Sequence, residues 1–362
     1  MKKICLIILS FFILLPAFAD EGKILPSATA VIENIEYIDL DNSVTQTKQN
    51  IQLKITSGEF KGNVLELENM LTGNPYYDIK LRKGSKVILH AEDNGQGIEY
   101  SIEDVHRSST LLWLSALFCG LLIYVGRRKG VYSLVAIVLS VLLISNCLTP
   151  MILFGINPVL ASLIICIIST AVTMFLVGGF NAKSSAAAVG VVLSLIFACL
   201  LSSITMFTAH LTGFTGENSL FLYSSHPELD FVGITISAMI LATLGAVMDV
   251  AMSISSTINE IYETDCSKTV KELFTSGMNV GRDIIGTMAN TLILVYLGGS
   301  LPLLLLAGNI DMQKFINLNQ VVTEIASALI GSIGIVICVP FTALVASAMI
   351  HKYAKLNQDI KL

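Results

Sequence analysis

Long apolar segments alternate with short polar connections over the last two thirds of the chain. About 20 consecutive apolar residues cross the hydrocarbon core of a bilayer as a helix. Seven segments approach or exceed that length, at about 110–125, 131–148, 158–177, 186–211, 231–256, 284–306 and 322–350. The pattern predicts an α-helical polytopic membrane bundle of about seven transmembrane helices.

The segment before these spans has a different pattern. Apolar and polar residues alternate at 51–55, 64–68 and 86–90, which is the two-residue period of half-buried strands. Turn-forming residues separate these runs, at Ser57-Gly58, Gly73-Asn74-Pro75, Lys83-Gly84 and Asn94-Gly95. We predict about five strands that form a small β-barrel, OB-like or SH3-like.

The first residues are typical of a secretory signal. Lys2 and Lys3 precede an apolar run at 4–15, and Ala17-Phe18-Ala19 provides a small-residue cleavage site. We predict a signal peptide at 1–19, an extracytoplasmic β domain at 20–108 and a membrane domain at 109–362. An uncleaved anchor helix is the alternative, and it would leave the β domain on the same side.

Composition and charge agree with a membrane protein. Hydrophobic residues make up 54% of the chain, charged residues only 14%, and the net charge of −5 argues against a nucleic-acid partner. Connections rich in Lys and Arg stay in the cytoplasm. Alternate connections and the tail hold Arg127, Arg128, Lys129, Lys183, Lys268, Lys271, Arg282, Lys352, Lys355 and Lys361, whereas the other connections hold only Lys314. We therefore expect a multi-pass protein of the cell membrane with its C-terminus in the cytoplasm.

Enzyme chemistry and cofactors are not indicated. The sequence has no H-E-x-x-H or G-x-S-x-G motif, and its cysteines show no C-x-x-C spacing. His90 and His106 are isolated from other metal-ligand types. We expect no catalytic residue, no metal and no cofactor.

Asp249 is the most informative single residue, because it is the only acidic residue well inside an apolar span. A carboxylate there costs about 2.5–3.5 kcal/mol on insertion scales unless it is protonated, paired or hydrated, so we expect Asp249 to face the interior of the bundle. Ser253 follows one helical turn later, and Asp283, Thr287 and Asn290 recur on one face of the sixth span. We predict that these stripes meet in an inward-facing polar site, with Arg282 near its mouth.

Three interpretations of this cluster stay open. In a substrate- or ion-binding site, Asp249 would bind a cation or a proton, and Ser253, Thr287 and Asn290 would supply neutral ligands. In a structural contact it would hydrogen-bond to Asn290 or pair with Arg282. An enzyme site would need a nucleophile, base or metal set that the sequence lacks.

These interpretations lead to two functional hypotheses. The leading one is a permease-like protein for a small solute or ion. The alternative is a non-transporting scaffold whose outer β domain binds an extracytoplasmic protein partner. The lipid bilayer is a partner in both cases, and seven spans are also compatible with a homodimer.

Helix breaks and small residues add two further predictions. The segment 298–302 contains two glycines and a proline and interrupts the sixth span, and Pro340 lies in the seventh. Backbone groups released by such breaks need partners inside the protein. Ser327, Gly331 and Gly334 form a small-residue face that is typical of a close helix contact.

Two long stretches resemble the YibE/F family of multispan membrane proteins. They are Gly245-Ala246-Val247-Met248-Asp249-Val250-Ala251-Met252-Ser253-Ile254 and 280–294, which reads VGRDIIGTMANTLIL. The segments 56–62 and 71–75 of the N-terminal region also fit this family, as does the step Leu301-Pro302. The resemblance implies an integral membrane architecture and no particular activity.

Overall fold

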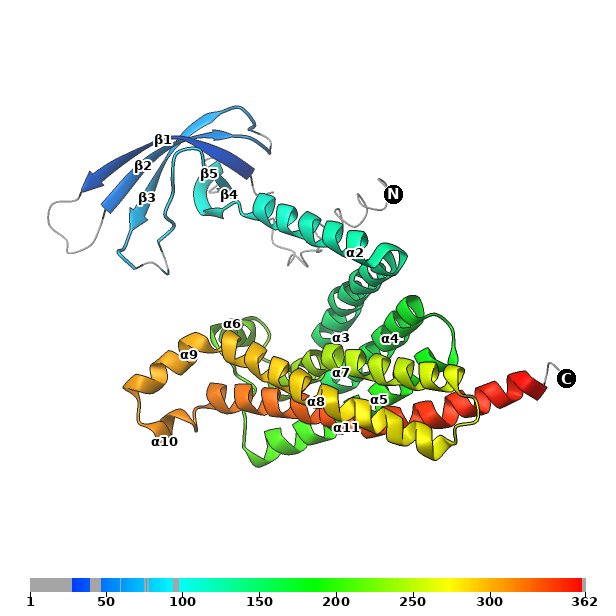
Figure 1. The fold of residues 1–362 in the computed structure, drawn as a ribbon. Coiled ribbons are helices and arrows are strands. Elements are labelled where there is room, and N and C mark those ends of the chain that lie inside the picture. The colour runs from blue at the N-terminus through cyan, green and yellow to red at the C-terminus, as the bar shows by residue number, and fades with distance from the viewer. Residues whose placement is uncertain are drawn as a thin grey trace. The chain divides into compact units, whose positions relative to one another are not determined.

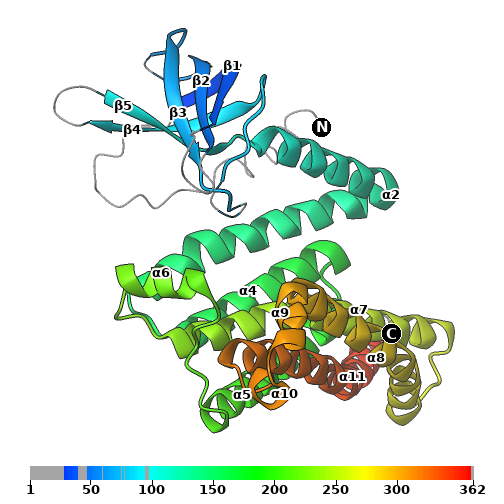
Figure 2. The same ribbon diagram turned by 90° about the vertical axis from the view of Figure 1, so that its left-hand side faces the viewer.

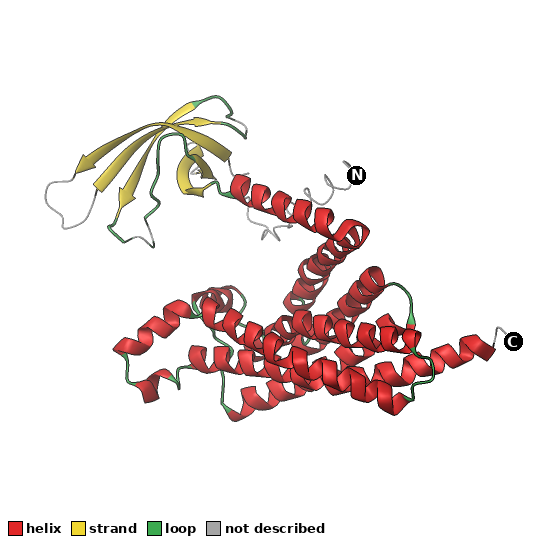
Figure 3. Ribbon diagram, in the orientation of Figure 1, coloured by secondary structure: helices red, strands yellow, loops and turns green. Residues whose placement is uncertain are grey.

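The structure is a computed structural model that describes residues 28–39, 47–58, 60–74, 76, 78–93 and 98–359. The predicted signal peptide and the turn at 94–95 therefore lie outside the described residues. The chain divides into two compact units, Met1–Leu121 and Leu122–Leu362. Figure 3 shows that the strands belong to the first unit and that the second is helical.

The N-terminal unit contains one antiparallel sheet. Its strands are β1 (Ala28–Asp39), β2 (Thr47–Ile55), β3 (Val64–Leu71), β4 (Lys86–Asp93) and β5 (Ile98–Val105). They lie in the order β3-β2-β1-β4-β5 (Figure 1). The five predicted strands are confirmed, and the positive φ angles of Gly58, Gly73 and Gly84 confirm three of the predicted turns.

The sheet curls into a half-barrel, which agrees with the small OB-like or SH3-like β-barrel that the sequence predicts. Its longest strand, β1, pairs with β2 over most of its length and with β4 only at its start, from Ala28 to Val31. A bulge between Ile32 and Asn34 bends β1 where the sheet turns. In the described residues β3 and β5 remain the two edges. Ile51, Leu53, Val87 and Leu89 fill the concave side.

The helical region begins with α2 (Ser108–Leu143), a π-helical turn η1 (Ile144–Leu148) and α3 (Thr149–Leu153) (Figures 1 and 2). It continues with α4 (Pro158–Gly178), α5 (Ala182–Thr208), α6 (Glu217–Ser225), α7 (Phe231–Thr264) and α8 (Val270–Gly299). It ends with α9 (Leu301–Leu306), a 3₁₀ turn η2 (Ala307–Asn309), α10 (Met312–Phe315) and α11 (Asn319–Asp359).

Six helical segments of the described chain are long and apolar enough to cross a membrane. The prediction of a polytopic helical bundle is confirmed. The number is six rather than seven because the first two predicted spans fall in one continuous segment, Ser108–Leu153. That segment is bent at Arg127, whose φ of 50° and ψ of −126° are not helical. Arg127 lies between the two predicted spans.

The core of the membrane unit lies where α5, α7 and α11 pack together. The Ser255 hydroxyl of α7 donates a hydrogen bond to the carbonyl oxygen of Lys183, 2.7 Å away in α5. A methyl group added to Gly334 of α11 would lie 2.8 Å from Cγ2 of Thr243, and Gly331 packs beside Leu292 and Thr243. The predicted close contact of this small-residue face is therefore confirmed.

The predicted break in the sixth span is confirmed, whereas Pro340 does not divide the last helix. Helix α8 ends at Gly299 and α9 begins at Leu301, with Ser300 between them. Pro340 lies inside α11, which stays one helix from Asn319 to Asp359. A proline removes only one backbone donor, and neighbouring helices can hold such a helix together in a membrane.

Candidate functional site

Asp249 lies on the exterior of the single chain rather than in its core, where the sequence places it. Helix α7 is otherwise the most enclosed span, because α4, α5, α8 and α11 all pack against it. Between Phe231 and Ser253, the exposed positions of α7 recur every three or four residues. They are Ala238, Ala242, Gly245, Asp249 and Ser253. All of them are small or polar, so α7 presents a narrow line without bulky apolar groups.

The neighbouring helix α8 presents a longer polar line. Every exposed position of α8 between Thr275 and Thr291 carries a polar residue or glycine. These positions are Thr275, Asn279, Arg282, Asp283, Gly286, Thr287, Asn290 and Thr291. The opposite face packs on the bundle through Leu273, Gly277 and Gly281. Beyond Thr291, the exposed residues become Leu294 and Val295, as on an ordinary lipid face.

Other spans show what a lipid-facing surface looks like in this protein. Their exposed positions carry large apolar side chains, as expected for contact with acyl chains. Examples are Ile164 on α4, Leu193, Ile196 and Leu200 on α5, and Leu329 and Ile333 on α11. The two polar lines therefore differ from the rest of the exterior of the membrane unit.

The packing of α7 on α8 sets the relative depth of the two lines. The helices run in opposite directions through a short turn, and Ile258 of α7 lies directly beside Gly277 of α8. Nine residues farther from the turn along each helix, about 14 Å at 1.5 Å per residue, Asp249 is level with Gly286. Asn290 lies about one turn beyond that level. The predicted partners are thus at similar depth on adjacent helices.

The side chains of the site are not joined to one another across the two helices. In the described part of the chain, no hydrogen bond or ion pair links the Asp249 carboxylate to Arg282 or Asn290. The Ser253 hydroxyl donates to the carbonyl oxygen of Asp249, 2.8 Å away, and the Thr287 hydroxyl donates to that of Ile284 at 2.9 Å. These hydroxyls retain lone pairs that can accept from, or coordinate, a ligand.

Arg282 and Asp283 of α8 likewise have no partner on another helix in the described chain. Arg282 donates from Nη1 to Oδ1 of Asn279, 3.1 Å away on the same helix, and is exposed. Asp283 is exposed next to it, and neither residue forms an ion pair with another described residue. The described residues also contain no group of three His, Cys, Asp or Glu side chains that could hold a metal ion.

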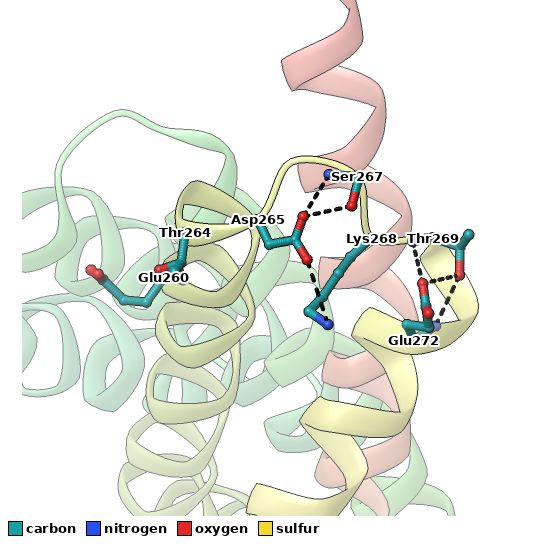
Figure 4. Close-up of polar contacts among 7 residues, drawn as sticks. All are labelled: Glu260, Thr264, Asp265, Ser267, Lys268, Thr269 and Glu272. Carbon is teal, nitrogen blue, oxygen red and sulfur yellow. Dashed lines mark hydrogen bonds and ion pairs between the residues drawn. The ribbon is translucent and has the colours of Figure 1, made fainter.

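A hydrogen-bonded turn between α7 and α8 fixes where the two lines begin (Figure 4). Thr269 and Glu272 form a reciprocal capping box at the start of α8, with the Thr269 backbone N–H 2.8 Å from the Glu272 carboxylate. The Asp265 carboxylate accepts from the Ser267 hydroxyl at 2.6 Å and from the Ser267 backbone N–H at 3.1 Å. These two hydrogen bonds, with the nearby charge of Lys268, lower the pKa of Asp265.

Sequence reasoning missed part of the α8 line. Asn279, Gly286 and Thr291 lie on the same exposed face as Asp283, Thr287 and Asn290. The signal was present, because 279, 283, 286, 290 continue the three-and-four spacing of one helix face. Sequence alone did not show that this face is turned away from the other helices of the helical unit.

Fold and site together define a polytopic helical membrane protein that carries a separate β domain and a polar face within its spans. Sequence models of one family match both parts. The model described as "YibE/F-like protein" matches residues 114–352, and the model described as "YibE/F family N-terminal domain" matches residues 27–105. The chain therefore belongs to the YibE/F family. No curated protein and no solved structure matches it.

Proposed function

We propose that this protein is a permease-like membrane protein in which the polar lines of α7 and α8 form the path of a small solute or ion. The observation that carries the proposal is that every exposed α8 position from Thr275 to Thr291 holds a polar residue or glycine. Within the predicted span, residues 284–291 make about two helical turns without an exposed apolar side chain. Such a stretch is unfavourable against lipid and favourable along a hydrated path. Enzyme activity is not part of this proposal.

Asp249 is the ion-coupling residue in this proposal. It is level with the polar stretch of α8, and its carboxylate has no partner among the described residues that would neutralise it. A carboxylate at that depth can exchange a proton or bind a cation as it passes. Thr287 at about that level, and Asn290 about one turn beyond it, would supply neutral oxygen ligands.

Proton flux is the first measurement. Vesicles of phosphatidylethanolamine and phosphatidylglycerol would contain the reconstituted full chain and an internal pH dye, with a potential imposed by a potassium gradient and valinomycin. We expect faster acidification with the wild type than with Asp249→Asn, because the amide cannot carry a proton. Glu324→Gln, in α11, is the control and should behave like the wild type. Equal rates for Asp249→Asn and wild type would remove Asp249 from proton coupling.

The orientation proposed for the chain follows its charges. The connection that joins α7 and α8 carries Lys268, whereas the connection between α5 and α7 carries Glu217, Glu228 and Asp230 and no Lys or Arg. By the positive-inside rule, the first of these connections is cytoplasmic. We therefore propose a protein of the cell membrane with its C-terminus in the cytoplasm and its β domain outside.

A second function is supported by the open edges of the β domain. In the described residues, β3 and β5 end the sheet with backbone groups that pair with no further strand. Such edges can accept an extended peptide as an added strand. If the protein is a scaffold that binds an envelope protein through this domain, cross-linkers placed at Val64 or Met70 should capture that partner specifically. Cells that carry Asp249→Asn should then have the same phenotype as cells with the wild-type protein.

A further inference from the structure

We propose that the polar faces of α7 and α8 are covered by a second copy of this chain, related by a two-fold axis along the membrane normal. The path of the proposed permease then lies at the dimer interface, and this placement rests on the function proposed above. The dimer itself rests on four separate observations of the single chain.

The first observation is a mismatch between hydropathy and burial. A span that is poor in apolar residues needs protein around it, because lipid cannot satisfy polar groups. The best window of α8 has a mean hydropathy of 1.2, whereas the other five spans range from 2.1 to 2.5. Yet only 11% of that window is buried, which is the lowest share of the six. Figure 1 shows α8 on the outside of the helical unit, packed on α11 and α7.

The second observation is charge self-complementarity. The face carries both signs, with Arg282 beside Asp283 on α8 and Asp249 on the adjacent helix. A two-fold axis along the membrane normal preserves depth, so Arg282 of one copy meets Asp283 of the other, and the reverse pair forms by symmetry. One surface thus provides both halves of a charge-paired interface.

The third observation is that the face allows close helix approach. A methyl group added at Gly245 or Gly286 would meet no atom within 4 Å, so both glycines are open. On the opposite face of α8, the space beside Gly277 is occupied by Ile258, and the space beside Gly281 is occupied by Val339. Small residues on membrane helices favour close packing with another helix. Gly286 lies at the level of Asp249 and Gly245 lies one turn away from it, so the partner helix would sit at this depth.

The fourth observation is the contrast with the lipid-facing surface. On α5 the exposed positions include Leu193, Ile196 and Leu200, which match acyl chains. On α8 the exposed positions between residues 284 and 291 of the predicted span are Gly286, Thr287, Asn290 and Thr291. Contact with lipid is therefore favourable for the exposed face of α5 and unfavourable for that of α8. A second copy can pack against the polar side because its own polar face presents hydrogen-bond donors and acceptors at the same depth in the membrane.

Cysteine cross-linking in native membranes tests the contact. In a chain with Cys147→Ser and Cys266→Ser, we expect Thr287→Cys to give a band of twice the chain mass with a short bismaleimide. Ile196→Cys, on the lipid-facing side of α5, is the matched control and should give only the monomer. Dimer bands of equal intensity from both variants, or from Ile196→Cys alone, would overturn the proposal. Capture of a band of different mass would assign the face to another protein.

Charge reversal tests the pairing independently. Arg282→Asp places like charges across the axis and should abolish the Thr287→Cys cross-link. The double variant Arg282→Asp with Asp283→Arg restores opposite charges in both symmetric pairs and should restore the cross-link. A double variant that stays uncross-linked while it elutes as a folded protein would contradict the pairing of these two residues.

The cross-linking and proton-flux experiments test the dimer and the permease function independently. A dimer that forms in Asp249→Asn and wild type alike, without any difference in flux, would leave the interface standing and remove the permease function. Flux that depends on Asp249 with no Thr287→Cys cross-link would do the opposite. The two proposals can therefore be judged one at a time.

Discussion

Asp265 shows how local hydrogen bonds set the charge state of a single residue in the turn between α7 and α8. Its carboxylate is stabilised by the Ser267 hydroxyl, the Ser267 backbone N–H and Lys268, so its pKa is lowered. A lowered pKa in the folded state means that these contacts stabilise the fold at pH values above the ordinary aspartate pKa of about 3.9. Their contribution is lost as the pH falls through the lowered value.

We predict that Ser267→Ala raises the pKa of Asp265 toward its ordinary value, because the largest stabilising hydrogen bond is removed. The measurement is a carbon NMR titration of the Asp265 carboxyl in the full chain in nanodiscs. Thr264→Ala is the matched control, since the Thr264 hydroxyl donates only to the carbonyl oxygen of Glu260. An Asp265 titration that is identical in Ser267→Ala and Thr264→Ala would show that the Ser267 hydroxyl does not hold the charge.

The same turn provides a second prediction at residue scale. The Thr269 hydroxyl accepts a hydrogen bond from the backbone N–H of Glu272, which completes the capping box of α8. We expect Thr269→Ala to lower the free energy of unfolding by about 1 kcal/mol, the usual cost of losing such a cap. Thr275→Ala, an exposed position later in α8, should cost less in the same thermal unfolding experiment. Equal losses would mean that α8 does not depend on its cap.

At the scale of the element, glycines report which helix faces are in contact. Gly190 of α5 packs directly on Thr342 of α11, with no room for a side chain. We predict that Gly190→Leu destabilises the bundle by about 1–3 kcal/mol, the usual range for overpacking, or more. Gly298→Leu is the matched control, because a methyl group there meets no atom within 4 Å. Thermal unfolding in detergent would compare them, and equal melting temperatures would contradict the tight contact of α5 with α11.

The elements themselves were largely predictable, because their signals are local. Strands β2, β3 and β4 follow from alternation, and the end of α8 follows from the two glycines and Pro302. The effect of Pro340 was not predictable, since packing on neighbouring helices decides whether a proline ends a membrane helix. The exterior position of Asp249 was not predictable either. Helical spacing shows that Asp249 and Ser253 share a face, but only tertiary packing shows where that face points.

At the scale of the whole molecule, the segment Ser108–Leu153 decides the topology. Its 46 residues would extend about 69 Å as a helix, more than twice the roughly 30 Å hydrocarbon thickness. Arg127, Arg128 and Lys129 lie near its middle, and three cations are too costly to hold at the centre of a bilayer. The non-helical backbone of Arg127 allows the chain to turn there. We therefore expect this segment to cross twice, with the basic residues at the membrane surface.

This expectation fixes the side on which the β domain lies. Two crossings in Ser108–Leu153, followed by α4, α5 and α7, place an odd number of spans between the β domain and Cys266, whereas a single crossing makes that number even. We predict that an impermeant maleimide labels Lys61→Cys in intact cells lacking an outer barrier, and labels Cys266 only in inverted vesicles. Cys266→Ser is the control for the second label. Labelling of both positions from the same side would show that Arg127 bends a helix without returning it through the membrane.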